Sequence, residues 1–151
     1  MQQTQENAPL PQEVTHRVEN VKVVKIIKST PTGKDAIVLL ENGDYKLGDL
    51  VFYPGGLAFF RNGVRIDVPC LEGKLMKILL ESEHCNQHRR KIREVLWGDK
   101  GGESACNDKL NSTVWRLRKA LAKLDPRIKI ESERGKGYEL CIYDAPEFQA
   151  D

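Results

Sequence analysis

The pattern of hydrophobic and polar residues predicts strands in the first half of the chain and helices in the middle. Between residues 21 and 68, runs of β-branched and aromatic residues alternate with turn sequences such as Asn42-Gly43 and Asn62-Gly63. This alternation is typical of an antiparallel sheet, because Asn-Gly tolerates the backbone geometry of a tight turn. The expected strands are 21–28, 36–40, 45–47, 50–53, 57–60 and 64–68.

The spacing of apolar residues changes to a helical period after Pro69. A first helix is expected from about Leu71 to Glu83, and residues 84–87 are then expected to be a polar connection. A second helix follows, and its apolar side is formed by Ile92, Val95, Leu96 and Trp97. Trp97 is therefore interpreted as a core residue. The glycine-bearing segment 98–105 is expected to be a loop.

A third helix, over residues 107–124, has the most regular pattern. Its apolar stripe consists of Leu110, Val114, Leu117, Leu121 and Leu124. Asp108 suits the positive end of the helix, and Asp125-Pro126 ends it. Polar, cationic and aromatic residues occupy the other faces: Lys109, Asn111, Ser112, Thr113, Trp115, Arg116, Arg118, Lys119 and Lys123. Taken alone, such a face is most often simply solvated.

Two strands near the C-terminus change that interpretation. Residues 128–132 and 138–142 predict a hairpin whose tip, Glu133 to Gly137, carries Arg134 and Lys136 next to Gly135 and Gly137. Three helices followed by a basic-tipped hairpin are the plan of a winged helix-turn-helix. In that plan the third helix can enter a major groove, and the hairpin can reach the backbone or the minor groove.

Composition and charge narrow the function classes. The net charge is only +2, but residues 66–143 hold 16 basic against 12 acidic residues, which is compatible with nucleic-acid binding. No arrangement of catalytic side chains is visible, so neither an enzyme nor a cofactor is expected. No apolar run approaches the roughly 20 residues of a membrane span, and the N-terminus lacks a signal-peptide pattern. Free thiols and a cytoplasmic protein are therefore expected.

Two short segments allow more than one interpretation. The run from His84 to His88 holds nitrogen and sulfur donors, but a zinc site needs four ligands, and the other cysteines are distant in sequence. A buried thiol at Cys85 is the favoured interpretation, and no metal is expected. The run from Arg89 to Arg93 is either a solvated face or a contact to phosphate at a helix start, and the phosphate contact is favoured.

Four motifs, in order and at this spacing, match a known family. They are Glu72 near the start of the first helix, Ile92-x-x-Val95-Leu96-Trp97-Gly98 at the end of the second, Arg116-Leu117-Arg118-Lys119-Ala120-Leu121 in the third, and Glu133-Arg134-Gly135-Lys136-Gly137-Tyr138 in the hairpin. From about residue 47 to residue 143 the chain resembles the OmpR/PhoB-type winged-helix DNA-binding domain. This is the effector domain of many bacterial two-component response regulators, here without a recognisable receiver domain.

The resemblance implies how the parts are used. It implies that helix 107–124 reads the major groove, that hairpin 128–142 is a wing on the minor groove or backbone, and that loop 98–106 can contact RNA polymerase. By position, it implies DNA contacts from Asn111, Thr113, Trp115, Arg118, Arg134 and, on the backbone, Arg89. For Trp115 the residues leave three possibilities open: contact with a thymine methyl group, a protein interface, or partial burial against the wing.

We therefore expect an α+β fold, a winged helix-turn-helix with an N-terminal antiparallel sheet, three helices and a C-terminal hairpin wing. The expected divisions are a tail at 1–19, an extra β-hairpin segment at 20–47, the DNA-binding domain at 48–143 and a tail at 144–151. The expected function is sequence-specific DNA binding by a transcriptional regulator. The alternative is a winged-helix adaptor that binds proteins and has weak or no DNA affinity. Segment 20–47 is expected to extend the sheet or to form a separate β unit, for a homodimer or a partner regulator.

The expected DNA contacts combine the third helix, the start of the second helix and the hairpin tip. They are Arg89, Arg90, Lys109, Asn111, Ser112, Thr113, Trp115, Arg116, Arg118, Lys119, Arg134 and Lys136.

Overall fold

The computed structural model describes residues 21–98, 105–133 and 136–146. The strands are β1 (Val23–Ser29), β2 (Ala36–Leu40), β3 (Tyr45–Leu47), β4 (Leu50–Tyr53), β5 (Ala58–Arg61), β6 (Val64–Asp67), β7 (Asn86–His88), β8 (Ile128–Glu133) and β9 (Gly137–Ile142). The helices are α2 (Cys70–Glu81), the short 3-10 turn η2 (Glu83–Cys85), α3 (Arg89–Trp97) and α4 (Ala105–Leu124). The expected mixed α+β class, with an antiparallel N-terminal sheet and helices after it, is confirmed.

The first six strands form one antiparallel sheet in the order β1-β2-β3-β4-β5-β6. The sheet expected for residues 50–68 is therefore present. Of the two possibilities for segment 20–47, the structure has the first, because its strands extend that same sheet. The sheet also runs through the boundary expected at residue 47, since Leu47 of β3 pairs directly with Leu50 of β4. Segment 20–47 is thus built into the fold.

A second sheet has the order β7-β9-β8 and includes a strand that the sequence did not predict. The segment expected to be a polar connection contains β7, whose Gln87 pairs with Tyr138 and whose His88 pairs with Gly137. That expectation is wrong because β7 is short and polar, so it shows no apolar alternation. The close approach needs Gly137, since a Cβ atom there would collide with the backbone of Gln87.

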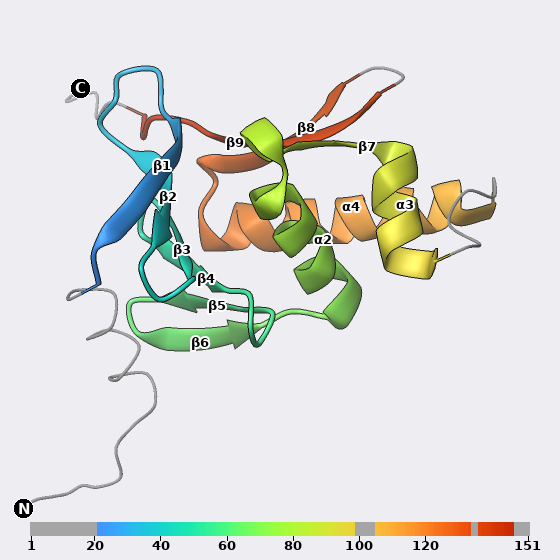
Figure 1. The fold of residues 1–151 in the computed structure, drawn as a ribbon, viewed down its shortest axis with the longest axis horizontal. Helices are drawn as coiled ribbons and strands as arrows, with labels where there is room; N and C mark the ends of the chain where they lie inside the picture. Colours follow the sequence, from blue (N-terminus) through green and yellow to red (C-terminus); the bar gives the residue numbers. More distant parts are fainter. Residues whose placement is uncertain (1–20, 99–104, 134–135, 147–151) are drawn as a thin grey trace, which may run out of the picture.

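The core lies where α2 and α4 pack between the two sheets (Figure 1). The predicted stripe of α4 is confirmed at its centre, because Leu110, Val114, Leu117 and Leu121 are all buried. Leu124 is half-buried and packs against the same core. Trp97 is half-buried and packs against the core, as expected. Val95 departs from the prediction, because it is exposed. With nine residues, α3 presents a narrower buried face than its sequence suggested, centred on Ile92.

Gly73 allows α2 to lie close to the turn between β4 and β5. A Cβ atom at Gly73 would come within 2.8 Å of the Cβ atom of Leu57. Leu57 itself has a φ of 52°, a left-handed conformation that costs energy for a residue with a branched side chain. The turn is therefore held against α2 by packing that a larger side chain at residue 73 would disrupt.

Polar side chains attach β1, β2 and the loop between them to the C-terminal sheet. The Nζ atom of Lys28 lies 2.5 Å from the Oε2 atom of Glu139 and donates to the carbonyl of Leu140 at 2.9 Å. Arg127 bonds Asp35 at 2.6 Å and Asp125 at 2.9 Å. The pairs Lys28–Glu139 and Arg127–Asp35 join segments about 90 to 110 residues apart in sequence, so they fix one sheet relative to the other.

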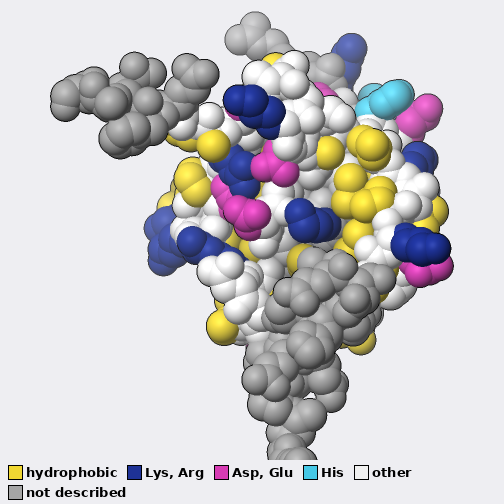
Figure 2. Space-filling view, turned by 90° about the vertical axis from the view of Figure 1, so that its left-hand side faces the viewer, with side chains coloured by type: hydrophobic (Ala, Val, Ile, Leu, Met, Phe, Trp, Pro, Cys, Tyr) yellow, Lys and Arg dark blue, Asp and Glu magenta, His cyan; other side chains and the backbone are white. Residues whose placement is uncertain are grey.

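β1 is the edge strand of the larger sheet and exposes Val23, Val24 and Ile26. Figure 2 views the molecule from the β1 side and shows hydrophobic side chains on this face among acidic and basic ones. None of the helices in residues 21–98, 105–133 and 136–146 has the length and apolar character needed to cross a membrane.

Candidate nucleic-acid interface

The α4 helix, the start of α3 and the turn end of the β8–β9 hairpin meet on one side of the molecule (Figure 1). We call the residues gathered there the basic surface; all of them are exposed except Arg89, which is half-buried. It consists of Arg89, Arg90, Asn111, Ser112, Trp115, Lys119 and Lys136. All of these were predicted as DNA contacts from the sequence.

Three side chains tie the elements of the basic surface together. The guanidinium of Arg89, at the start of α3, donates one hydrogen bond to the hydroxyl of Tyr138 on β9 and another, of 2.8 Å, to the Oδ1 atom of Asn111 on α4. The Tyr138 hydroxyl donates to the same Oδ1 atom at 3.3 Å. Since each residue comes from a different element, this triangle fixes α3, α4 and β9 relative to one another.

A depression of about 570 Å³ lies beside this triangle. It is lined by His88, Arg89, Arg90, Lys91, Arg93, Glu94 and Lys136. The backbone N–H of Arg89 donates to the carbonyl of Lys136 at 3.0 Å, which brings the hairpin to the start of α3. Glu94 pairs with Arg90 at 3.2 Å. Cationic residues outnumber this carboxylate, so the depression is suited to an anion such as a phosphate group.

The outward face of α4 carries exposed side chains at Asn111, Ser112, Trp115 and Lys119. Trp115 is 59% exposed, so burial against the hairpin, one of the three possibilities left open for it, is not found. The Nζ atom of Lys119 lies 4.4 Å from the centre of the Trp115 ring, a cation–π contact across one helical turn. Lys109 is also exposed on α4.

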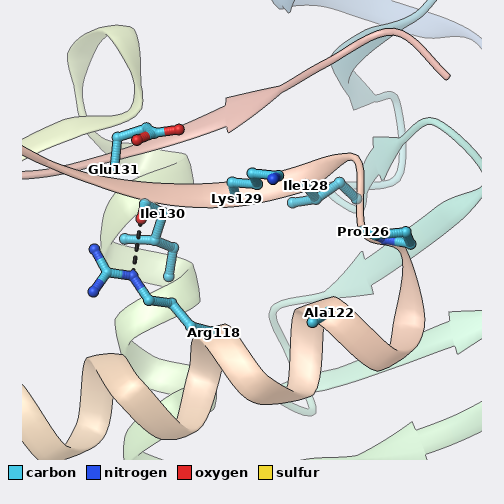
Figure 3. A pocket seen from close by; sticks show the side chains of 7 residues that line it. All are labelled: Arg118, Ala122, Pro126, Ile128, Lys129, Ile130 and Glu131. Carbon is cyan, nitrogen blue, oxygen red and sulfur yellow. Dashed lines mark hydrogen bonds between the residues drawn. The ribbon is translucent and has the colours of Figure 1, made fainter. Parts of the chain in front are cut away.

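Arg118 holds the hairpin to α4. Its Nε atom donates to the carbonyl of Ile130 at 2.9 Å, and its terminal nitrogen donates to the hydroxyl of Ser132 at 2.8 Å. Figure 3 shows this side chain reaching from α4 to β8, beside a depression of about 400 Å³. Arg118 was predicted to contact DNA. In the structure its hydrogen bonds instead position the hairpin.

Thr113 and Arg116 depart further from the prediction. The Thr113 side chain is fully buried, and its hydroxyl donates to the carbonyl of Lys109 one turn earlier at 2.8 Å. Because the apolar stripe is wide enough to include residue 113, this side chain cannot reach a base edge, and its predicted contact with DNA is wrong. Arg116 points to the other flank, where it lies 3.4 Å from the buried carboxylate of Glu72 on α2.

The remaining predictions concern the hairpin tip and the segment before α3. Arg134 and most of loop 98–106 lie outside the described residues. Cys85 is buried, and burial raises the pKa of its thiol to about 11, so the thiol remains protonated near neutral pH. Among the described residues, no group of three or more His, Cys, Asp or Glu side chains could hold a metal ion.

Tyr138, Lys91 and Arg93 were not predicted as site residues. Tyr138 belongs to the hairpin motif, but an aromatic residue on a strand predicts a core position and gives no sign of a binding role. The Tyr138 side chain is in fact buried. Its hydroxyl alone reaches the basic surface. Lys91 and Arg93 lie in the basic run that was noted in the sequence. Helical spacing could have placed Arg93 beside Arg89 and Arg90, since it follows them by four and three positions, but it gives no such signal for Lys91.

A comparison with models of known protein families gives no match to the chain, and a comparison with curated proteins gives none either.

Proposed function

We propose that the chain is a sequence-specific DNA-binding transcriptional regulator of the winged-helix type. In this proposal α4 enters the major groove, and the β8–β9 hairpin acts as a wing on the backbone or minor groove. The observation that carries the proposal is the hydrogen-bonded triangle of Arg89, Asn111 and Tyr138. It joins the exposed face of α4, the basic start of α3 and the hairpin into one surface, which is what simultaneous contact with a groove and its two phosphate walls requires.

The residues divide into two groups by their chemistry. Lys119, Lys136 and Arg90 are exposed cations, so we assign them to phosphates, which set affinity and orientation. Asn111 and Ser112 are exposed, uncharged and hydrogen-bonding, so we assign them to base edges. Arg116 and Arg118 support the fold from the flanks of α4.

Selection of bound sequences from a library of random duplexes tests the proposal. We expect an enriched motif. Ser112→Ala is expected to change the preference at particular base pairs, whereas Lys119→Ala should keep the motif and weaken binding to every sequence. Binding without an enriched motif would contradict sequence specificity, and no binding to any duplex would overturn the proposal.

The alternative function is a winged-helix adaptor that binds a protein. The exposed Trp115 supports it, because tryptophan is enriched in the energetically important centres of protein interfaces. The two functions differ in one measurable property: DNA binding that neutralises phosphates weakens steeply with salt, whereas an interface centred on an aromatic side chain does not.

Two further partners remain proposals of the same kind. Contact with RNA polymerase through loop 98–106 would place the polymerase next to α3. Self-association or a partner regulator would use β1, the exposed edge of segment 20–47.

A further inference from the structure

We propose that Asn111 is a specificity-determining residue that selects guanine, because its amide is held with the donor side facing outward. This inference rests on the proposed function and names the base that one side chain would read. A free asparagine in a major groove pairs with adenine, since its amide offers one donor and one acceptor. In this structure the acceptor is already used.

The hydrogen bonds of the triangle fix which atom of the Asn111 amide is which. A guanidinium can only donate, so the atom that faces the terminal nitrogen of Arg89 at 2.8 Å must be the oxygen. The Tyr138 hydroxyl accepts from Arg89 and therefore has its own hydrogen free for the same oxygen, 3.3 Å away. The Oδ1 atom thus accepts two hydrogen bonds, which fills its two lone pairs.

The surroundings of Tyr138 keep this arrangement in place. Its ring is buried, with the guanidinium of Arg89 5.3 Å and that of Arg118 5.8 Å from the ring centre. Arg118 is itself bonded to the backbone of β8. Turning the Asn111 amide over would direct its N–H groups at the cationic Arg89, so the orientation is set before any ligand arrives.

Only the two N–H donors of Asn111 remain for a partner. In the major groove, guanine presents two adjacent acceptors, N7 and O6, whereas cytosine presents a donor, adenine presents one donor beside one acceptor, and thymine presents a single acceptor, O4, beside its methyl group. An amide that can only donate therefore matches guanine and forfeits the usual pairing with adenine. Asn111 is exposed on the outward side of α4, where such an edge would lie.

The test is Asn111→Asp, examined by repeating the selection from random duplexes with the full chain. The carboxylate has nearly the shape of the amide and keeps an oxygen toward Arg89 and Tyr138, but it presents an acceptor where the amide presented donors. We expect one base-pair position to change from guanine to cytosine, whose amino group can donate to a carboxylate. Added negative charge weakens binding to all sequences, so the preference between bases is the quantity to compare.

Modified bases test the same contact without altering the protein. At the position that Asn111→Asp changes, 7-deazaguanine removes the N7 acceptor and should weaken binding by wild-type protein about 5-fold, the lower end of a typical single-base effect. Inosine keeps N7 and O6 and should bind like guanine. With Asn111→Asp, the loss from 7-deazaguanine should disappear.

Tyr138→Phe tests the positioning role. Removing the hydroxyl leaves Arg89 as the sole partner of the Asn111 oxygen, so the preference for guanine over adenine should fall. The salt dependence should not change, because no cation is removed. A purely structural role for Tyr138 would lower the midpoint of urea unfolding and leave the base preference as it was.

The outcomes separate this inference from the function on which it rests. If the chain binds DNA with an enriched motif that Asn111→Asp leaves unchanged, or if the affected position prefers adenine or thymine in wild-type protein, the assignment of guanine is wrong and the regulator remains. If no duplex is bound at all, both the assignment of guanine and the proposed DNA-binding function are wrong.

Discussion

Basic residues differ between two regions of the molecule: two of them in one region are half-buried in ion pairs, and two in the other are exposed without an acidic partner among the described residues. Where the two sheets meet, Arg127 and Lys28 are half-buried and paired with carboxylates. On the basic surface, Lys119 and Lys136 are exposed, and no ion pair joins either of them to an acidic side chain of the described residues.

The difference shows why the net charge of +2 says little about function. A cation already paired and partly buried supports the fold, and recruiting it to a ligand would leave its carboxylate without a partner. An exposed, unpaired cation contributes little to stability and remains available to a phosphate. The proposal therefore predicts that mutations in the two regions have separable effects, on unfolding in one region and on binding in the other.

The largest effect is expected for Arg127→Met. The Arg127 side chain is 15% exposed and its partner Asp125 is 12% exposed, so the substitution leaves a partly buried carboxylate unpaired. We expect the free energy of unfolding to fall by about 2–4 kcal/mol, measured by urea denaturation. Arg65→Met is the matched control, because its pair with Asp67 is exposed, and it should cost less than ~1 kcal/mol. Equal losses for both variants would remove the distinction between buried and exposed pairs.

Acidification gives a second measure of the same ion pair. Burial alone would raise the pKa of Asp125, but the hydrogen bonds and charge of Arg127 outweigh burial and hold that pKa below its ordinary value. The lowered pKa stabilises the fold at pH values above the pKa that Asp125 has in the unfolded chain. This contribution to stability disappears as the pH falls through the pKa that Asp125 has in the folded protein. Wild-type protein should therefore lose stability below about pH 4. Urea denaturation from pH 6 to pH 3 should show a smaller loss for Arg127→Met, and a parallel loss would contradict this account.

Two neighbours on α4 provide the next comparison. Arg116→Met removes the partner of the buried Glu72 carboxylate, so we expect the free energy of unfolding to fall by about 1–2 kcal/mol with little change in the salt dependence of DNA binding. Lys119→Met should do the reverse, leaving unfolding within about 0.5 kcal/mol and reducing the salt slope by about one unit. If Arg116→Met changes the salt slope by as much as Lys119→Met, Arg116 belongs to the interface after all.

Much of the architecture could be predicted because its strands and helices have regular patterns of apolar and polar residues in the sequence. Period-two runs and Asn-Gly turns predicted the strands of the larger sheet, and the stripe from Leu110 to Leu121 predicted the buried side of α4. Strand β7 could not be predicted, because its three polar residues are held by pairing with β9, a partner about 50 residues away in sequence.

The candidate site was harder to predict than the fold. Residue type and helical spacing placed Asn111, Ser112 and Lys119 on an outward face. They did not separate Arg116, Arg118 and Lys119, three cations within four positions, because their roles depend on which flank faces α2 and which faces β8. Thr113 was misassigned because the buried stripe is one residue wider than the apolar residues indicate.

The smallest effect on stability is expected for Ile26→Lys. This residue is 63% exposed on the edge strand β1, so unfolding should change by less than about 0.5 kcal/mol. If β1 mediates self-association, the charge should shift sedimentation from dimer to monomer. Deleting the whole segment would be less informative, since Ile37 and Leu47 belong to the core. Identical sedimentation of both proteins would exclude β1 as the contact.

The most direct test of DNA binding is fluorescence anisotropy of a labelled duplex titrated with wild-type protein and Lys119→Met at several salt concentrations. Neutralised phosphates release counterions, so the logarithm of the association constant should fall linearly with the logarithm of salt concentration. We expect a steep negative slope for wild-type protein and one shallower by about one unit for Lys119→Met. An association constant that does not depend on salt, or is the same for both proteins, would contradict the assignment of the basic surface to DNA.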